Sequence, residues 1–274
     1  MDLLWPIITM GALGLLFSTG LVFAYKKLKV TIDPKIEQIS GLLPQANCGA
    51  CGFSGCQAFA EAVVNNKVNP SECPISGDEI AEQIADILGV KSEEKKVKKV
   101  ARILCRGTKE AAKEKGQYLG IPSCASAHLI GGNKSCSFGC LGFGDCARAC
   151  PFDAIEMKDD GLPHIIEEKC TACGICVEEC PRNIIELFPL SQNIFVFCRS
   201  HDNGKISRKV CKNACIACNI CVRACPEAIV LENNLAKITD VKKIDKDKIP
   251  AIQKCPTGAI GLLKKEDNKD NDER

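Results

Sequence analysis

The sequence predicts an α+β protein with one N-terminal transmembrane helix, a small helical module and two related α+β modules in tandem. Three observations predict this organisation: a charge-free run opens the chain, an internal repeat occupies its second half, and 21 of the 274 residues are Cys. The expected parts are an anchor (1–30), a helical module (31–90), a basic linker and connecting segment (91–134), two repeated modules (135–190 and 191–263) and a charged, disordered tail (264–274).

The composition excludes several classes of protein. The 36 Lys and Arg residues nearly balance the 34 Asp and Glu residues, so no basic excess points to nucleic acid as a partner. A hydrophobic content of 46% is too high for a disordered chain, and 3 His are too few for a His-rich zinc or copper enzyme. The density of cysteine indicates instead that metal clusters replace part of an apolar core.

The N-terminal run, Leu3–Tyr25, has 23 residues and no charge. As a helix it would rise roughly 34 Å, enough to cross the hydrocarbon layer of a membrane. Trp5 and Tyr25 lie near its ends, where aromatic rings favour the headgroup level, and three lysines follow from Lys26. This bias places the N-terminus outside and the rest in the cytoplasm. A cleaved signal peptide would instead expose the cysteines to an oxidising compartment, but no basic stretch precedes the run and no small-residue cleavage site follows it.

Residues 31–90 combine helical apolar spacing with a compact cysteine motif. Short helices are expected at 31–44, at 57–65 and at 78–88, the last ended by Gly89. The motif between them contains four cysteines with intervening glycines, which permit close backbone approach to a cluster. We expect a [4Fe–4S] cubane here, bound by Cys48, Cys51, Cys56 and Cys73.

Charge changes sign after this module. Residues 31–90 carry 8 acidic and 2 basic side chains, whereas residues 91–115 carry 10 basic and 4 acidic ones. The basic stretch is either a solvated linker and helix face or a docking patch for an acidic protein.

The repeat aligns residues 135–151 with residues 210–226 without a gap, and RILCRG around Cys105 resembles FVFCRS around Cys198. Such repeats indicate one structural unit used twice. A Cys-Pro pair followed by a short apolar stretch recurs four times, which predicts four short strands, after Cys150, Cys180, Cys225 and Cys255.

The first repeated module contains the loop Cys170-x2-Cys173-x2-Cys176-x3-Cys180-Pro181, which matches bacterial two-cluster ferredoxins. In those proteins three cysteines of the loop bind one cubane and the fourth binds the neighbouring one. The rule predicts one cluster on Cys150, Cys170, Cys173 and Cys176, and a second on Cys136, Cys140, Cys146 and Cys180. The second set has irregular spacing, with Phe143 where the repeat has Cys218.

The second repeated module keeps one regular set, Cys215, Cys218, Cys221 and Cys255, which predicts a fourth cluster. Asp245, Lys248 and Ala251 stand where a further cluster would need cysteines, so we expect that cluster to be absent. Zinc ribbons use paired C-x2-C hairpins rather than three cysteines at these intervals, which disfavours zinc. Five cysteines remain for a fifth cluster, a structural metal or buried free thiols: Cys105, Cys124, Cys198, Cys211 and Cys225.

The order of these parts resembles the B subunit of Rnf, the ion-translocating ferredoxin:NAD+ oxidoreductase, in its longer form from anaerobes. The resemblance rests on the N-terminal span, the CGxCGxxGC motif from Cys48 to Cys56 and the ferredoxin loops. It implies a membrane-anchored electron-transfer subunit that takes electrons from reduced soluble ferredoxin and passes them to membrane and flavin-containing subunits. The whole complex would couple this flow to Na+ or H+ translocation and NAD+ reduction, and we expect no independent catalytic site on this chain.

Two other functions fit the same residues. One is an electron-transfer subunit of another membrane-bound oxidoreductase, such as a hydrogenase or a dehydrogenase. The other is a non-redox scaffold held together by metal.

Overall fold

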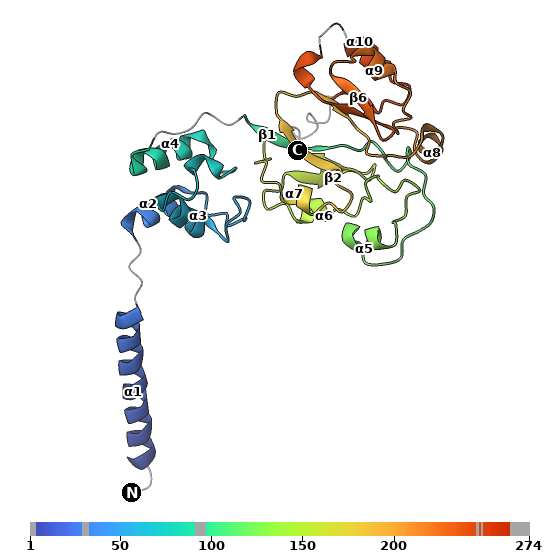
Figure 1. The fold of residues 1–274 in the computed structure, drawn as a ribbon. Helices are drawn as coiled ribbons and strands as arrows, with labels where there is room; N and C mark the ends of the chain where they lie inside the picture. The colour runs from blue at the N-terminus through green and yellow to red at the C-terminus, as the bar shows by residue number, and fades with distance from the viewer. Residues whose placement is uncertain (1–3, 29–32, 91–96, 245–246, 248, 264–274) are drawn as a thin grey trace, which may run out of the picture.

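The computed structural model describes residues 4–28, 33–90, 97–244, 247 and 249–263 (Figure 1). The expected tail at 264–274, and Asp245 and Lys248, lie outside these residues. Helix α1 (Leu4–Leu28) is the one helix in the described ranges that is long and apolar enough to cross a membrane. Its large apolar side chains are exposed along its length instead of packing against protein, as a lipid-facing helix requires.

The helical module follows as α2 (Pro34–Leu42), α3 (Cys56–Val64), the 3-10 helix η1 (Pro70–Glu72) and α4 (Gly77–Leu88). The Asp33 carboxylate caps α2 by accepting the Lys35 N–H at 2.9 Å, and Gly89 ends α4 in the left-handed conformation (φ 71°). The helices bury one apolar cluster made of Ile39, Leu43, Phe59, Ala60, Val63 and Ile84. The three helices expected in this region are confirmed.

The first repeated module contains β1 (Lys99–Ile103), α5 (Cys124–Leu129), α6 (Asp145–Arg148), β2 (Ile155–Met157), β3 (Pro163–Ile165), α7 (Ile175–Glu178) and β4 (Ile185–Pro189). Strand β1 pairs antiparallel with β4, and β2 with β3. Val100 and Ala101 of β1 are buried in the core of this module. The module therefore begins within the segment expected to be a linker, upstream of residue 135.

Apart from one added 3-10 helix, η2, the second repeated module has the same order of elements: β5 (Ile194–Val196), α8 (Gly204–Val210), α9 (Ile220–Ala224), β6 (Ile229–Glu232), β7 (Leu235–Ile238), η2 (Val241–Lys243), α10 (Ile249–Gln253) and β8 (Ile260–Leu262). Strand β5 pairs with β8, and β6 with β7, both antiparallel. The Leu104 N–H donates to Ile184 O as the Phe197 N–H donates to Ala259 O, each at 2.7 Å. The repeat in the sequence is thus a repeat of topology, and the four strands expected after Cys-Pro are confirmed.

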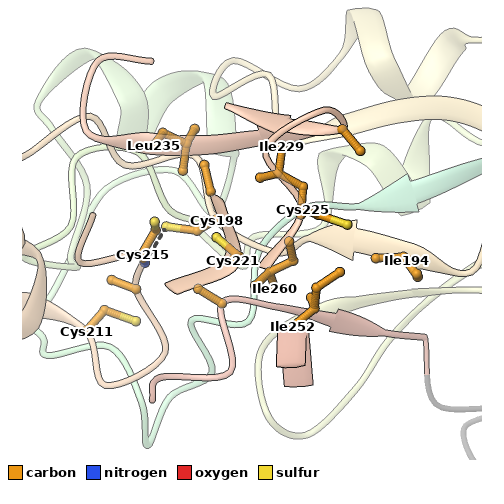
Figure 2. Packing of buried hydrophobic residues seen from close by; sticks show 14 of the residues in the cluster. Ile194, Cys198, Cys211, Cys215, Cys221, Cys225, Ile229, Leu235, Ile252 and Ile260 are labelled. Carbon is orange, nitrogen blue, oxygen red and sulfur yellow. Dashed lines mark hydrogen bonds between the residues drawn. The ribbon is translucent and has the colours of Figure 1, made fainter. Parts of the chain in front are cut away.

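An apolar core fills the part of the second module that corresponds to the Cys150 turn and its partner loop (Figure 2). Cys225, which aligns with Cys150, and Ile252 of α10 are each only 1% exposed and belong to one cluster. Helix α10 takes the place in the order of elements that α7 and its cysteine loop take in the first module. Cys225 therefore acts as a small apolar core residue.

The two repeated modules lie against each other through their Cys-Arg loops. The Arg106 guanidinium donates to Gly258 O at 3.0 Å and Leu262 O at 3.2 Å, and lies 3.7 Å from the centre of the Phe197 ring. Arg199, its counterpart in the repeat, forms an ion pair with Glu186 of β4. Each loop thus contacts the other module and braces the interface.

Candidate iron–sulfur sites

The regular loop of the first module wraps a cavity of about 330 Å³ that is lined by Cys150, Cys170, Cys173 and Cys176. Ala172 (φ 57°) and Gly174 (φ 88°) adopt left-handed backbone conformations, which turn the loop around the cavity. The Ala101 N–H donates to the Cys170 Sγ at 3.5 Å. The structure brings together the four cysteines that the spacing grouped.

The second module builds an equivalent cavity, also of about 330 Å³, lined by Cys215, Cys218, Cys221 and Cys255. Ala217 (φ 54°) and Asn219 (φ 61°) repeat the left-handed positions of the first loop. Burial opposes ionisation of Cys255, but hydrogen bonds from Ile260, Thr257 and Ala259 outweigh it and lower the pKa of the thiol. These hydrogen bonds favour the thiolate form of Cys255, which is the form that a cluster ligand takes.

The third cavity, of about 370 Å³, has a different set of cysteines from the expected one. Cys140, Cys146 and Cys180 line it as predicted, but the fourth is Cys124 rather than Cys136. Cys124 begins α5. Burial is the main cause that raises the pKa of Cys146, and the nearby Cys124 thiol raises it further. Because Phe143 stands at the place of Cys218, this loop supplies one sulfur fewer than its counterpart, and a distant segment supplies the missing one.

Asp145 holds Cys124 beside this cavity. Its carboxylate, on a residue only 6% exposed, accepts the Ser123 hydroxyl at 2.9 Å and the Ala125 N–H at 3.0 Å. Burial raises the pKa of Asp145, but the hydrogen bonds around Cys124 and the Arg148 guanidinium lower it below its usual value. The start of α5 is therefore tied to the start of α6, which carries Cys146.

Cys136 lies in a fourth cavity, of about 350 Å³, together with three cysteines that the spacing left unassigned: Cys105, Cys198 and Cys211. This cavity lies between the two modules, since Cys105 follows β1 and Cys198 follows β5. The sequence contained a signal for this grouping, because Cys136 aligns with Cys211 in the repeat.

In the helical module, Cys51, Cys56 and Cys73 pack against the apolar cluster beneath α3. Asn47 Oδ1 accepts the Cys56 N–H at 2.9 Å and thereby closes the loop. Gly55 leaves room for this amide oxygen, because a Cβ there would lie 2.8 Å from Asn47 Oδ1. Burial is the main cause that raises the pKa of Cys173, and the Cys48 thiol is one of the nearby groups that raise it further. The helical module therefore lies beside the first regular loop.

The cysteine sets fit iron–sulfur cubanes better than single metal ions. Burial and then neighbouring thiols raise the pKa of Cys146 and Cys176 to about 12, so adjacent thiolates need positive charge beside them, which iron would supply. A single zinc ion needs four sulfurs at ~2.3 Å from one point. Throughout the described parts of the chain, no group of three or more His, Cys, Asp or Glu side chains is arranged to hold one ion. A cubane spreads its four ligands over four irons, so it suits four cysteines that line one cavity.

Family models and curated proteins match the same regions. A model described as "Putative Fe-S cluster" matches residues 43–75, and one described as "4Fe-4S dicluster domain" matches residues 137–187. The chain is 44% identical over 264 residues to the B subunit of the Na(+)-translocating ferredoxin:NAD(+) oxidoreductase complex of Acetobacterium woodii, a match that covers 94% of this chain and 77% of the relative.

Two further relatives extend this similarity. The B subunit of the proton-translocating ferredoxin:NAD(+) oxidoreductase complex of Clostridium ljungdahlii is 38% identical over 94% of this chain and 91% of its own length. The B subunit of an ion-translocating oxidoreductase complex of Methanosarcina acetivorans is 36% identical over 75% of this chain and 78% of its own length.

Proposed function

Because the chain belongs to the family of B subunits of ion-translocating ferredoxin:NAD(+) oxidoreductase complexes, we propose that it accepts electrons from reduced ferredoxin and relays them to membrane subunits of such a complex. The observation that carries this proposal is a series of cysteine-lined cavities on a chain whose described residues include one apolar helix long enough to be an anchor. Cubanes exchange single electrons over a wide range of potentials, which includes the low potentials of ferredoxins.

The arrangement of the cysteines supports an order for the relay. Cys146 is close enough to Cys176 to raise its pKa, which links the two cavities of the first module. Cys48 has the same kind of influence on Cys173, which links that module to the helical one. The helical module follows the anchor in the chain, so the order runs from the second module through the first to the Cys48 set at the membrane.

The lysines that follow the anchor support an orientation in the membrane. Lys26 and Lys27 end α1, whereas no basic residue precedes the apolar run. The positive-inside rule then places the N-terminus outside and all cysteine sites in the cytoplasm, where soluble ferredoxin is available.

Exposed basic side chains around the Cys218 loop support docking of an acidic donor at the second module. Lys205, Lys209, Lys212 and Arg223 are all exposed, on α8, beside it and on α9. Charge of one sign beside a redox site steers an oppositely charged partner and raises its rate of association. The basic stretch at 91–115 is the second candidate surface.

The relay is tested by breaking its last member. In the intact complex, Cys48→Ser should leave ferredoxin able to reduce the sites of the two repeated modules, as followed by anaerobic EPR, while the membrane subunits stay oxidised. Cys225→Ala changes a buried cysteine that lines none of the four cavities described above and is the matched control. Reduction of the membrane subunits at the wild-type rate in Cys48→Ser would show that the route to the membrane bypasses this module.

The two other functions give different results in the same preparations. A chain that serves a hydrogenase or dehydrogenase would co-purify with a catalytic metal subunit instead of flavoproteins and multispan subunits. A metal-stapled scaffold would give no reversible low-potential EPR signals in a redox titration.

A further inference from the structure

We propose that Cys105, Cys136, Cys198 and Cys211 bind a fifth [4Fe–4S] cluster at the interface between the two repeated modules. Each module contributes two of the four cysteines, so the site exists only where the modules meet. The site itself is independent of the proposed function, whereas its role as a bridge in the relay rests on it.

The cavity is about as large as the regular sites and is lined by the same number of cysteines. It measures about 350 Å³, between the 330 Å³ of the two regular loops and the 370 Å³ of the Cys124 site. Three of its cysteines are less than 9% exposed, and the fourth, Cys105, is half-buried. Four unpaired cysteines therefore line one cavity, the same number that lines each regular site.

One short segment of backbone fixes two of the four sulfurs. The Lys113 N–H donates to Val210 O at 2.8 Å, and the Lys113 carbonyl accepts the Ser135 N–H at 2.7 Å. Residues 111–115 therefore lie between the strand-like segment that carries Cys136 and the one that carries Cys211, with an isolated bridge from Ala112 to Cys211. Both cysteines are positioned by the same central segment.

The other two sulfurs receive matched hydrogen bonds from the two halves of the repeat. The Cys105 Sγ accepts the N–H of Gly107 at 3.4 Å and the N–H of Cys140 at 3.4 Å. The Cys198 Sγ accepts the N–H of Ser200 at 3.4 Å and the N–H of Cys215 at 3.3 Å, the latter drawn in Figure 2. Gly107 and Ser200 correspond in the repeat, as do Cys140 and Cys215, so the site has approximate twofold symmetry. N–H donors of this kind stabilise sulfur that carries negative charge, as a cluster ligand does.

Two glycines lie against the sulfurs of this cavity. A Cβ on Gly107 would lie 3.4 Å from the Cys105 Sγ and 3.8 Å from the Cys211 Sγ. A Cβ on Gly139 would lie 3.4 Å from the Cys136 Sγ and 3.8 Å from the Cys105 Sγ. Neither glycine has the positive φ that would explain its presence by backbone conformation. A Cβ at either place would make ordinary van der Waals contact with these sulfurs and take up space beside them.

A buried cation supplies charge to the same cavity. Lys134 is 4% exposed, lines the cavity, and its ammonium donates to Gly107 O at 2.7 Å. A buried ammonium is costly without a negative partner, and in the described surroundings it is hydrogen-bonded to a neutral carbonyl rather than paired with a carboxylate. Four thiolates around an iron–sulfur core give the site the net negative charge that this ammonium lacks.

The position of the site joins the two halves of the relay. Cys140 and Cys215, whose N–H groups donate to its sulfurs, are themselves in the cavities of the first and second modules. One electron that crosses the interface would leave the site of one module, which is oxidised, and arrive at the site of the other, which is reduced. The proposed site lies between these two.

Native mass spectrometry of the full chain, purified without oxygen in detergent, tests the site. We expect the wild type to carry five Fe4S4 units, about 20 iron atoms, whereas four units account for about 16. Cys198→Ser and Cys211→Ser should each lose one unit and keep four, and Cys225→Ala should keep five. Because a variant can misfold, the count in the wild type is read first, and the EPR signals of the remaining clusters serve as the check on folding in each variant.

Three results would overturn the proposal. They are four units in the wild type with the four thiols open to alkylation, the mass of a single zinc ion in place of one unit, and an unchanged count in both serine variants. The outcome is separable from that of the relay. Five units on a chain that ferredoxin does not reduce would refute the proposed function and keep the site, and four units on a chain that ferredoxin reduces would do the opposite.

Discussion

Replacing Phe143 with Cys should make Cys124 dispensable. The loop Cys140–Cys146 has left-handed Gly142 (φ 80°) and Gly144 (φ 77°), at the places where the second module has left-handed Ala217 and Asn219. Because the two loops share these conformations, a side chain at 143 leaves the backbone as Cys218 does in its own loop. Phe143→Cys therefore places a sulfur where the regular loop has one.

The sizes of the opposing effects favour rescue. Phe143 packs against Tyr118 with ring centres 5.1 Å apart, and losing this aromatic pair costs about 1 kcal/mol. The lost burial of a half-buried ring adds about 1–2 kcal/mol. A structural zinc site contributes about 10–16 kcal/mol to folding through four ligands, so on that scale one ligand regained is worth about 2.5–4 kcal/mol, which at least matches the packing lost.

The assay is the count of Fe4S4 units in anaerobically purified full-length chain, together with EPR after reduction. Cys124→Ser should lose one unit, Phe143→Cys alone should keep the wild-type count, and the double variant Cys124→Ser/Phe143→Cys should regain it. Cys136→Ser should also lose one unit, but Phe143→Cys should not restore it, because Cys136 lies in the interface cavity. Rescue of Cys136→Ser instead of Cys124→Ser would refute this assignment of the ligands.

Three further outcomes follow from the described contacts. Asp145→Ala removes the acceptor that holds the start of α5, so a chelator should extract iron from the Cys124 site about tenfold faster, as measured by loss of its EPR signal. Ile252→Ala empties a fully buried position and should destabilise the second module by about 2–4 kcal/mol, seen as faster amide exchange in β8 with no change in iron content. Lys209→Glu/Lys212→Glu should slow reduction by ferredoxin about tenfold at low salt, with the difference closing as salt is raised. Lys99→Glu, in the basic stretch at 91–115, is the control for this double variant. If Lys99→Glu slowed reduction by ferredoxin more than the double variant did, the docking surface would be at β1 instead.

Local features of the sequence predicted the parts of the sites that are built locally. Three cysteines within seven residues, with left-handed positions between them, wrap one cavity whatever the rest of the chain does, so the loops from Cys170 and Cys215 are where the spacing placed them. The same holds for the helices of the first 90 residues, whose apolar spacing and terminal signals are short-range. The strands after each Cys-Pro pair also follow from neighbouring residues.

Ligands that arrive from distant segments could not be predicted from spacing. The path of the chain between Cys124 and Cys136 depends on the hydrogen bonds of Asp145 and on the pairing of residues 111–115, neither of which leaves a periodic pattern in the sequence. Two signals were nevertheless present. Cys136 aligns with Cys211, which had no place in a regular loop, and Phe143 leaves its own loop one sulfur short.

The second module contributes fewer cysteine sites than the first because an apolar core replaces one of them. Ile252 and Cys225 are packed together at 1% exposure, where the first module has a cavity between the Cys150 turn and the Cys170 loop. A relay can be entered or left only where a site exists, so on the described geometry the second module offers one redox contact beyond the interface, at the Cys215 loop. The exposed basic side chains of Lys209 and Lys212 come just before that loop in the chain. The loss of a site and the placement of charge thus both favour docking of an acidic donor at the second module. This module is at the C-terminal end of the relay, and the anchor is at the N-terminal end.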